Sequence, residues 1–236
     1  MPETKPPRRP DRPAGFTTAR LPAPAGRPVR LYLPDDYQPK YAYPLVLVFH
    51  AAGDDEDAAA RLAPRLSRRN YIVACPRGPV ALGNDPAGRP AFDWTTTGPR
   101  LARLALGVLN HCRREYHVHA GRVYLLGVGD GAAVAYRVAS ALGDRVAGVV
   151  ALNGSPPAAR FTPAEGLRVF VGHGSSNPVV PLAAARKAAR TLSAAGADVR
   201  FEPYPTTHRL HDDMLRDVNR WLIETVNPDA LPHETN

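Results

Sequence analysis

The residues with the clearest chemical implication lie in one run, in which a short apolar strand leads into three glycines and an alanine-rich helix. The strand is expected at Val123–Leu126, the glycines are Gly127, Gly129 and Gly131, and the helix follows from about Ala132. A tight turn between a strand and a helix presents its middle residue at the edge of a parallel sheet, where a serine hydroxyl could attack a carbonyl carbon. The middle residue here is Gly129, so the pattern predicts the turn without an attacking group.

Two polar segments further along the chain could complete such a site. Asn177 lies in the segment His173–Pro181, and His208 ends the segment Tyr204–His208, just before the last expected helix. A histidine can serve as a general base, and a neighbouring carboxylate would stabilise the imidazolium that forms. Asn177 is an amide and cannot supply that carboxylate.

These segments, with one more near the N-terminus, resemble the α/β-hydrolases, and among them the carboxylesterases and phospholipases of the dienelactone hydrolase and acyl-thioesterase type. Tyr43–Asp54 looks like the strand and oxyanion turn, and the turn around Gly129 looks like the nucleophile elbow. His173–Pro181 is similar to the acid loop H-G-x-x-D-x-x-V-P, and Tyr204–His208 to the catalytic-histidine turn. Their order along the chain is that of this superfamily. The resemblance covers about Val29–Leu222.

The resemblance implies a catalytic triad in which two of three groups are substituted. Gly129 falls at the nucleophile position, Asn177 falls at the acid position, and His208 is the retained histidine. In serine hydrolases, loss of the nucleophile lowers kcat by about 10⁶ and replacement of the acid by its amide by about 10⁴. The resulting interpretation is a carboxylesterase-like, phospholipase-like pseudoenzyme with a binding or scaffolding role.

The alternative is an active ester hydrolase that uses another group. Asp130 comes one residue after the elbow position, which is about 100° further round a helix, and its simpler role is an acid at a helix N-terminus. Ser155, Ser175 and Ser176 lie in expected turns, where serine is common. A water activated by His208 is the remaining candidate.

The resemblance also places an oxyanion hole between the elbow and the turn after His50. Position 51 is usually glycine in the family, and alanine would distort this turn if it needs a positive φ. The carboxylate of Asp130 would repel an oxyanion formed beside its own amide. Trp94 either lines a pocket or anchors the long loop expected over residues 78–99 by burial. The candidate binding residues are therefore His50, Ala51, Ala52, Trp94 and Asp130.

The histidines and cysteines predict neither a metal site nor a cofactor. His50 and His173 already have places in the hydrolase pattern, and His117 with His119 joins no acid at a ligand spacing. The two cysteines match no metal or redox spacing. We expect the ligand to be a small ester-like molecule or a protein partner.

The elements that must position these residues alternate between strands and helices. The apolar run Tyr43–His50 is typical of a strand buried on both faces, and Tyr71–Pro76 is expected to form the next strand. Helices are expected over residues 54–69, 100–115, 132–142, 182–194 and 212–225. The alternation predicts an α/β fold: a doubly wound, mostly parallel sheet with helices on both faces.

Composition sets the limits of this interpretation. The chain has 236 residues, which suits one domain, and we expect a flexible proline- and arginine-rich tail over 1–27, an α/β-hydrolase domain over 28–226 and a C-terminal tail over 227–236. The net charge is +8, but no aromatic residues are interleaved with the arginines, so no nucleic-acid partner is expected. No apolar stretch approaches the roughly 20 residues of a membrane span. The N-terminus has no apolar signal segment, so we expect a cytoplasmic protein.

Overall fold

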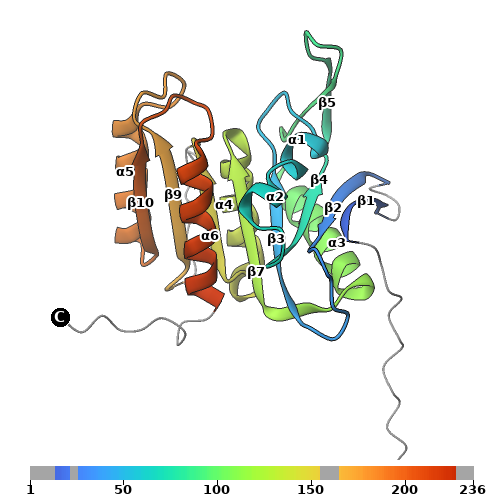
Figure 1. The fold of residues 1–236 in the computed structure, drawn as a ribbon. Coiled ribbons are helices and arrows are strands. Elements are labelled where there is room, and N and C mark those ends of the chain that lie inside the picture. The colour runs from blue at the N-terminus through green and yellow to red at the C-terminus, as the bar shows by residue number, and fades with distance from the viewer. Residues whose placement is uncertain (1–13, 22–25, 155–164, 227–236) are drawn as a thin grey trace, which may run out of the picture.

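The fold is one eight-stranded sheet in a computed structural model that describes residues 14–21, 26–154 and 165–226 (Figure 1). The spatial order of the strands is β1-β2-β4-β3-β7-β8-β9-β10. β2 pairs antiparallel with β1 and with β4, and every other neighbouring pair is parallel. The strands are β1 Gly15–Arg20, β2 Pro28–Leu33, β3 Tyr43–Phe49, β4 Ile72–Pro76, β7 Val118–Val128, β8 Gly148–Leu152, β9 Arg168–Gly174 and β10 Asp198–Tyr204.

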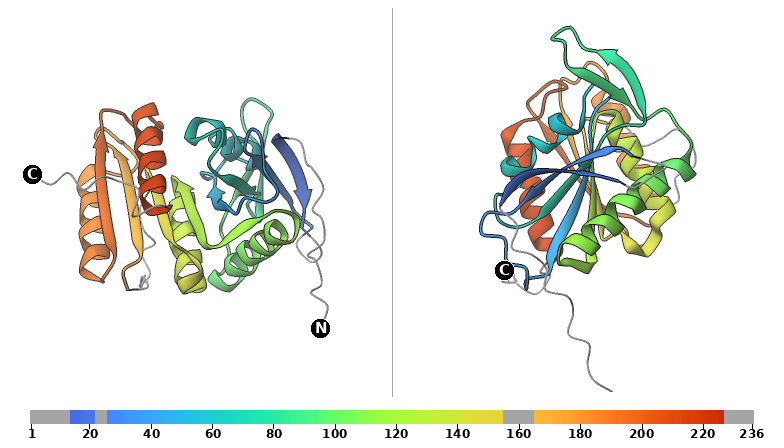
Figure 2. Two further views of the ribbon diagram at one scale, coloured as in Figure 1. Left: turned by 60° about the horizontal axis from the view of Figure 1, so that its bottom comes forward. Right: turned by 90° about the vertical axis from the view of Figure 1, so that its right-hand side faces the viewer.

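Helices cover both faces of this sheet, as Figure 2 shows. The helices are α1 Glu56–Ala60, α2 Ala63–Leu66, α3 Gly98–Glu115, α4 Asp130–Leu142, α5 Leu182–Ala194 and α6 Asp212–Val226, with a 3₁₀ turn at Gly143–Arg145. α1, α2 and α6 pack on one face, and α3, α4 and α5 on the other. The predicted doubly wound α/β fold is confirmed.

β3 shows why a continuous apolar run is needed in the middle of such a sheet. Leu45 and Leu47 pack into the core under α3 and α4, whereas Val46 and Val48 pack into the core under α1 and α6. Successive side chains of a strand point to opposite faces, and here both faces are covered. All seven residues of β3 are therefore buried.

The predicted flexible tail over residues 1–27 is wrong for residues 15–20, which form the edge strand β1. β1 pairs with the whole of β2, Arg30 donates a hydrogen bond to the Thr18 hydroxyl, and Leu21 is buried. Phe16, Thr17 and Thr18 are good strand formers, but flanking prolines conceal the short run in the sequence. At the other end of the domain, α6 ends at Val226, and residues 227–236, expected to form a C-terminal tail, lie outside the described residues.

The single helix expected over residues 54–69 is two short helices. α1 begins after Asp55, whose side chain accepts a hydrogen bond from Ala58 N at 2.7 Å, and α2 begins after Leu62. Pro64 lies in the first turn of α2, where its missing N–H has no effect. The proline therefore starts a second helix instead of kinking the first.

The long loop expected over residues 78–99 contains a β-hairpin. β5 Val80–Asn84 pairs antiparallel with β6 Pro90–Asp93 and projects from the body of the protein (Figure 1). At its turn, Asp85 Oδ1 accepts hydrogen bonds from the backbone N–H groups of Ala87 and Arg89. Proline and glycine within these strands hide the hairpin from a pattern-based prediction.

Candidate active site

Gly129 forms the bend between β7 and α4, in a backbone conformation that favours glycine. Its φ is 54° and its ψ is −122°, and its N–H donates to Leu152 O at 2.9 Å. The neighbouring glycines are needed for space: a Cβ on Gly127 would lie 2.2 Å from Gly131 O, and one on Gly131 would lie 2.2 Å from Phe49 O. Gly129 adopts the bend without strain, and the other two glycines are needed for close approach of the backbone.

His208 faces Gly129 across a narrow gap. A Cβ built on Gly129 lies 3.5 Å from His208 Nε2 and 3.3 Å from Ala51 Cβ. On its other side, His208 Nδ1 lies 3.2 Å from Asn177 Oδ1. The structure thus brings the three residues predicted for the triad positions together, although 78 residues of sequence lie between the first and the last.

The hydrogen bonds of Asn177 set the tautomer of His208. Asn177 Oδ1 accepts from Val179 N at 2.9 Å and from Val180 N at 3.1 Å, which identifies this atom as the oxygen. His208 Nδ1 must then carry a hydrogen, and in the neutral ring Nε2 is an acceptor on the side of Gly129. Asn177 is only 6% exposed, and among the described residues its Nδ2 has no hydrogen-bond partner.

Asn153 holds the loop that carries His208, a role that sequence reasoning missed. It is fully buried with φ 55°, and its Nδ2 donates to His208 O at 3.0 Å and to Arg209 O at 3.2 Å. Its Oδ1 accepts from Gly174 N at 2.9 Å, which ties the same loop to β9. Asparagine tolerates the left-handed conformation, so the Asn-Gly pair directly after a buried strand was the available signal.

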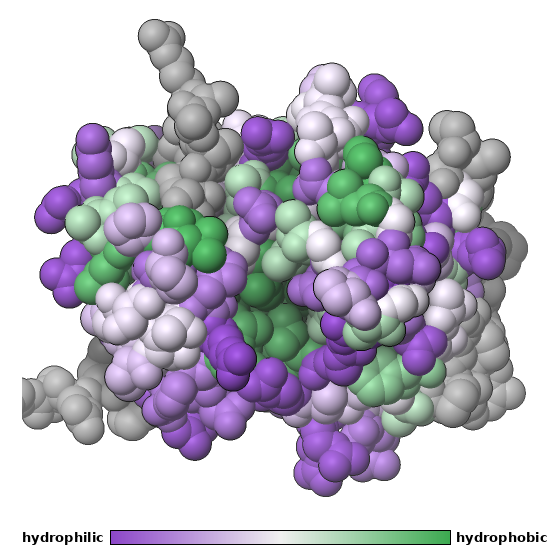
Figure 3. Space-filling model, turned by 90° about the horizontal axis from the view of Figure 1, so that it is seen from above, coloured by the Kyte–Doolittle hydropathy of each residue, from purple (hydrophilic) through white to green (hydrophobic). Residues whose placement is uncertain are grey.

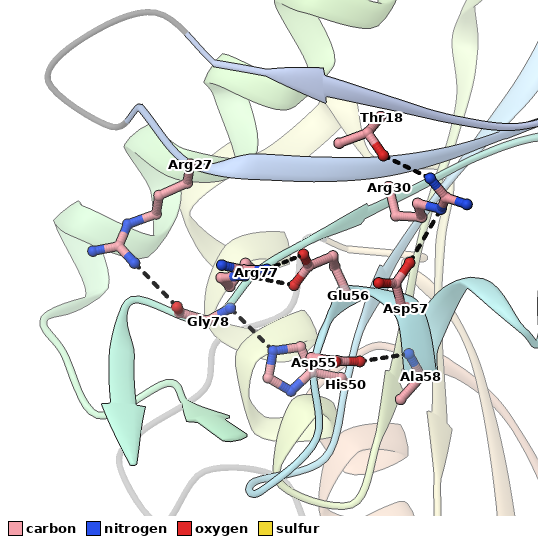
Figure 4. Close-up of polar contacts among 10 residues, drawn as sticks. All are labelled: Thr18, Arg27, Arg30, His50, Asp55, Glu56, Asp57, Ala58, Arg77 and Gly78. Carbon is pink, nitrogen blue, oxygen red and sulfur yellow. Dashed lines mark hydrogen bonds and ion pairs between the residues drawn. The ribbon is translucent and has the colours of Figure 1, made fainter. Parts of the chain in front are cut away.

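The side chain of His50 is buried and forms hydrogen bonds to the protein backbone. His50 is 1% exposed, its Nδ1 donates to Ala51 O at 2.8 Å, and its Nε2 accepts from Gly78 N at 3.0 Å (Figure 4). Desolvation lowers the pKa of this imidazole, so the neutral form is favoured. His50 therefore joins the turn after β3 to the chain after β4.

Trp94 anchors its loop, which is one of the two roles weighed for it. It is 3% exposed, and its indole Nε1 donates to His50 O at 2.9 Å. Its ring also packs against the rings of His50 and Phe49. Burial on this scale leaves almost none of its surface for a ligand.

The turn after His50 does not need a positive φ at position 51, so the expected distortion by alanine does not occur. Among the described non-glycine residues, a positive φ is found only at Asp36 and Asn153. The glycine conformation in this turn falls on Gly53, with φ 86°. Ala51 is half-buried and Ala52 is exposed. Ala51 affects the site through its methyl group, which lies beside Gly129.

The other candidate nucleophiles lie at the surface. Asp130 is exposed and is the first residue of α4. Ser175 and Ser176 are exposed, and their backbone N–H groups donate to Tyr204 O and Thr206 O, which ties the two loops together. Ser155 lies outside the described residues.

His173 is buried and contacts the loop that contains Asn177. It is 0% exposed, its Nε2 donates to Val180 O at 2.8 Å, and desolvation lowers its pKa.

Within the described part of the chain, no group of three histidine, cysteine or acidic side chains is placed to hold a metal ion. None of the described helices combines the length and apolarity required to cross a membrane.

Apolar residues are exposed in the middle of the face that contains the carboxyl ends of the parallel strands. Figure 3 views the molecule from this side and shows them between hydrophilic margins. Val179, two residues after Asn177, is 66% exposed. This end of the sheet therefore offers both the polar group of His208 and apolar surface.

Known esterases are similar to this chain in sequence and in fold. The esterase YpfH of Escherichia coli is 28% identical to this chain over 175 residues, which cover 69% of this chain and 74% of that protein. A bifunctional acetylxylan esterase/xylanase of Neocallimastix patriciarum is 22% identical over 158 residues, which are 66% of this chain and only 20% of that protein. The carboxylesterase of Bacillus cereus shares the fold, with a TM-score of 0.68 at 19% identity over 86% of this chain and 96% of that one.

The family model described as phospholipase/carboxylesterase matches residues 106–226, more than half of the chain. This segment includes the turn at Gly129 and the loops of Asn177 and His208. The chain therefore belongs to the phospholipase/carboxylesterase family of α/β-hydrolases.

Proposed function

We propose that this chain is a non-catalytic member of its family, which binds a ligand at the site formed by Gly129, Asn177 and His208. One observation carries the proposal: a side chain at residue 129 would begin 3.5 Å from His208 Nε2, and residue 129 is a glycine. A covalent mechanism needs a nucleophile within hydrogen-bond reach of its base. The position that meets this condition has no side-chain atom.

The state of His208 supports the same proposal. Asn177 orients the ring through its Oδ1 but brings no negative charge. A general base becomes an imidazolium in the transition state, and an amide stabilises that charge far less than a carboxylate does. His208 is therefore well placed to accept a hydrogen bond from a ligand and poorly supported as a base.

The test is hydrolysis of short p-nitrophenyl esters by the purified chain. We expect the same rate from the wild-type protein and from His208→Ala, at the background of the buffer. A fluorophosphonate probe should leave the wild-type protein unlabelled. A covalent adduct mapped to Ser155, Ser175 or Ser176 would contradict the proposal, because it would identify a nucleophile elsewhere.

The second candidate function is ester hydrolysis by a water that His208 activates, or less directly by Asp130 or a loop serine. Among these groups the water is favoured, because His208 Nε2 faces residue 129 and can accept a hydrogen bond there. Nε2 would take a proton from water, the hydroxide would add to the ester carbonyl, and the leaving alkoxide would receive that proton. Turnover that disappears in His208→Ala while the fluorophosphonate leaves no adduct would identify this reaction.

A further inference from the structure

An open pocket lies at the end of the sheet opposite to the turn at Gly129. It holds about 360 Å³ between the starts of β3 and β4, the loop before β3 and the last turns of α6. α6 begins four residues after His208, and Ile223 in the pocket wall lies 11 residues further along this helix, which is about 17 Å (Figure 1). The pocket is therefore separate from the site of Gly129 and His208.

Aromatic and aliphatic side chains form much of the wall of this pocket. Tyr41 packs edge-on against Tyr43 with their ring centroids 4.7 Å apart, yet Tyr41 remains 49% exposed. Ile223 adds an aliphatic side chain from α6 that is 38% exposed. The exposed ring of Tyr41 favours a ligand with an aromatic body, because a second ring can stack on it or meet its edge.

The tyrosine rings are held in place by hydrogen bonds within the protein. The Tyr43 hydroxyl accepts from Gln38 N at 3.1 Å, and the Tyr71 hydroxyl donates to Asn219 Oδ1 at 2.9 Å. Both rings line the pocket. The wall is therefore formed before a ligand arrives, which lowers the entropic cost of binding.

Arg69 is the only charged residue that lines the pocket. It is exposed, and Ser67 Oγ fixes its backbone by accepting from Arg69 N at 3.2 Å. The neighbouring Arg68 is paired with Asp35, whereas no carboxylate within the described part of the chain pairs with Arg69. Its guanidinium group is thus available to an anionic ligand.

One positive charge beside apolar walls matches a ligand with one negative charge. A carboxylate presents two oxygens in the geometry that a guanidinium group binds through two parallel hydrogen bonds. A phosphate monoester carries about −1.5 to −2 at neutral pH, and its additional charge would meet the apolar wall without a partner. The charge of Arg69 therefore favours a carboxylate.

We propose that this pocket binds an aromatic carboxylate, with its ring against Tyr41 and Ile223 and its carboxylate on Arg69. Burial of the ring supplies most of the affinity, and Arg69 selects the acid over neutral molecules of the same shape. This binding does not depend on the proposed function, because none of the residues at the triad positions lines the pocket.

The experiment titrates the full chain with 2-naphthoate and with 2-naphthamide, its neutral counterpart of nearly the same shape, and records ¹H–¹⁵N NMR spectra. We expect 2-naphthoate to bind at least about fivefold more tightly, because hydrogen bonds between two charged groups are stronger than those to an amide. It should shift the Nε–H resonance of Arg69 and the amide resonances of Asn70 and Ile223. The amide resonances of Gly129 and His208 should not move.

A saturated ligand and two variants test the parts of the site separately. Decalin-2-carboxylate keeps the charge and loses the aromatic rings, and it should bind at least about threefold more weakly than 2-naphthoate. Arg69→Gln should remove the preference for the acid over the amide, and Tyr41→Ala should weaken both about fivefold. Arg68→Gln, the matched control, makes the same change of charge one residue away and should leave both affinities unchanged.

No binding of 2-naphthoate to the wild-type chain, equal binding of the amide or of the saturated acid, or shifts confined to the residues around His208 would each overturn the proposal. Equal effects of Arg69→Gln and Arg68→Gln would also overturn it, because the net charge of the protein would then attract the acid. The three ligands are compared on the wild-type chain, so the result does not depend on the folding of a variant. Absence of binding would leave the proposed function untouched, and ester hydrolysis would leave this pocket untouched.

Discussion

Gly129, Ala51 and His208 meet so closely that a serine at residue 129 needs more room than the site now offers. The Ala51 methyl group lies 3.3 Å from the position that the serine Cβ would take. The serine would also adopt φ near 54°, a conformation that costs a non-glycine residue about 1–3 kcal/mol. We therefore expect that a serine at residue 129 alone is insufficient for ester hydrolysis.

At the residue scale we predict that a variant with three changes hydrolyses esters faster than a variant with two. Gly129→Ser with Asn177→Asp rebuilds the triad, and adding Ala51→Gly removes the methyl group beside the new Cβ. The triple variant should hydrolyse p-nitrophenyl butyrate about 10²-fold or more above the wild-type background, the usual contribution of a general base. The double variant should be slower.

His208→Ala in the triple variant is the matched control and should return the rate to background. Fluorophosphonate labelling of the serine introduced at residue 129 would be the direct readout of a nucleophile. If the triple variant folds, stays unlabelled and is inactive, the crowding by Ala51 is not what blocks catalysis.

At the scale of elements, the sequence is most informative where one physical rule dominates. β3 was predictable because both of its faces are buried, and the turn at Gly129 because three glycines stand between a strand and a helix. β1 and the hairpin of β5 and β6 were not predicted, since edge strands bury little and can contain proline or glycine. The turn after His50 shows the same limit in the site, because its positive φ falls on Gly53 and not on residue 51.

One ion pair joins α1 to the chain after β4, and we predict that removal of its arginine strongly destabilises the fold. Arg77 Nε, after β4, donates to Glu56 Oε2 of α1 at 2.7 Å, and the Glu56 side chain is only 5% exposed (Figure 4). Arg77→Leu would leave this carboxylate buried and unpaired. The free energy of unfolding in urea should fall by an amount toward the lower end of about 3–5 kcal/mol, because Arg77 itself is partly exposed.

The exposed pair Arg68–Asp35 provides the control for that measurement. Its N–O distance is 2.8 Å, almost the same, but the Arg68 side chain is 71% exposed. Arg68→Leu should change the free energy of unfolding by less than about 1 kcal/mol. Equal effects of the two substitutions would show that burial of Glu56 does not matter.

At the scale of the whole molecule, the buried histidines connect the site to the stability of the domain. His50 and His173 lie beneath the turns at the carboxyl ends of β3 and β9, and both are at most 1% exposed. Desolvation lowers the pKa of each imidazole, so the folded protein keeps both rings neutral at a pH where the unfolded chain protonates them. The same burial that fixes the loops therefore makes the fold sensitive to acid.

The sign of this dependence follows from proton uptake. Above a pH of about 6.5, the usual histidine value, neither state binds the proton and stability is complete. As the pH falls below that value, the unfolded chain binds protons that the folded protein excludes, so stability decreases. We expect the free energy of unfolding in urea to drop between pH 7.5 and pH 5.5 by up to about 1.4 kcal/mol for each of the two histidines. His50→Gln can still accept the hydrogen bond from Gly78 N and should show a smaller drop, whereas an unchanged drop would mean that protonation of His50 does not oppose folding.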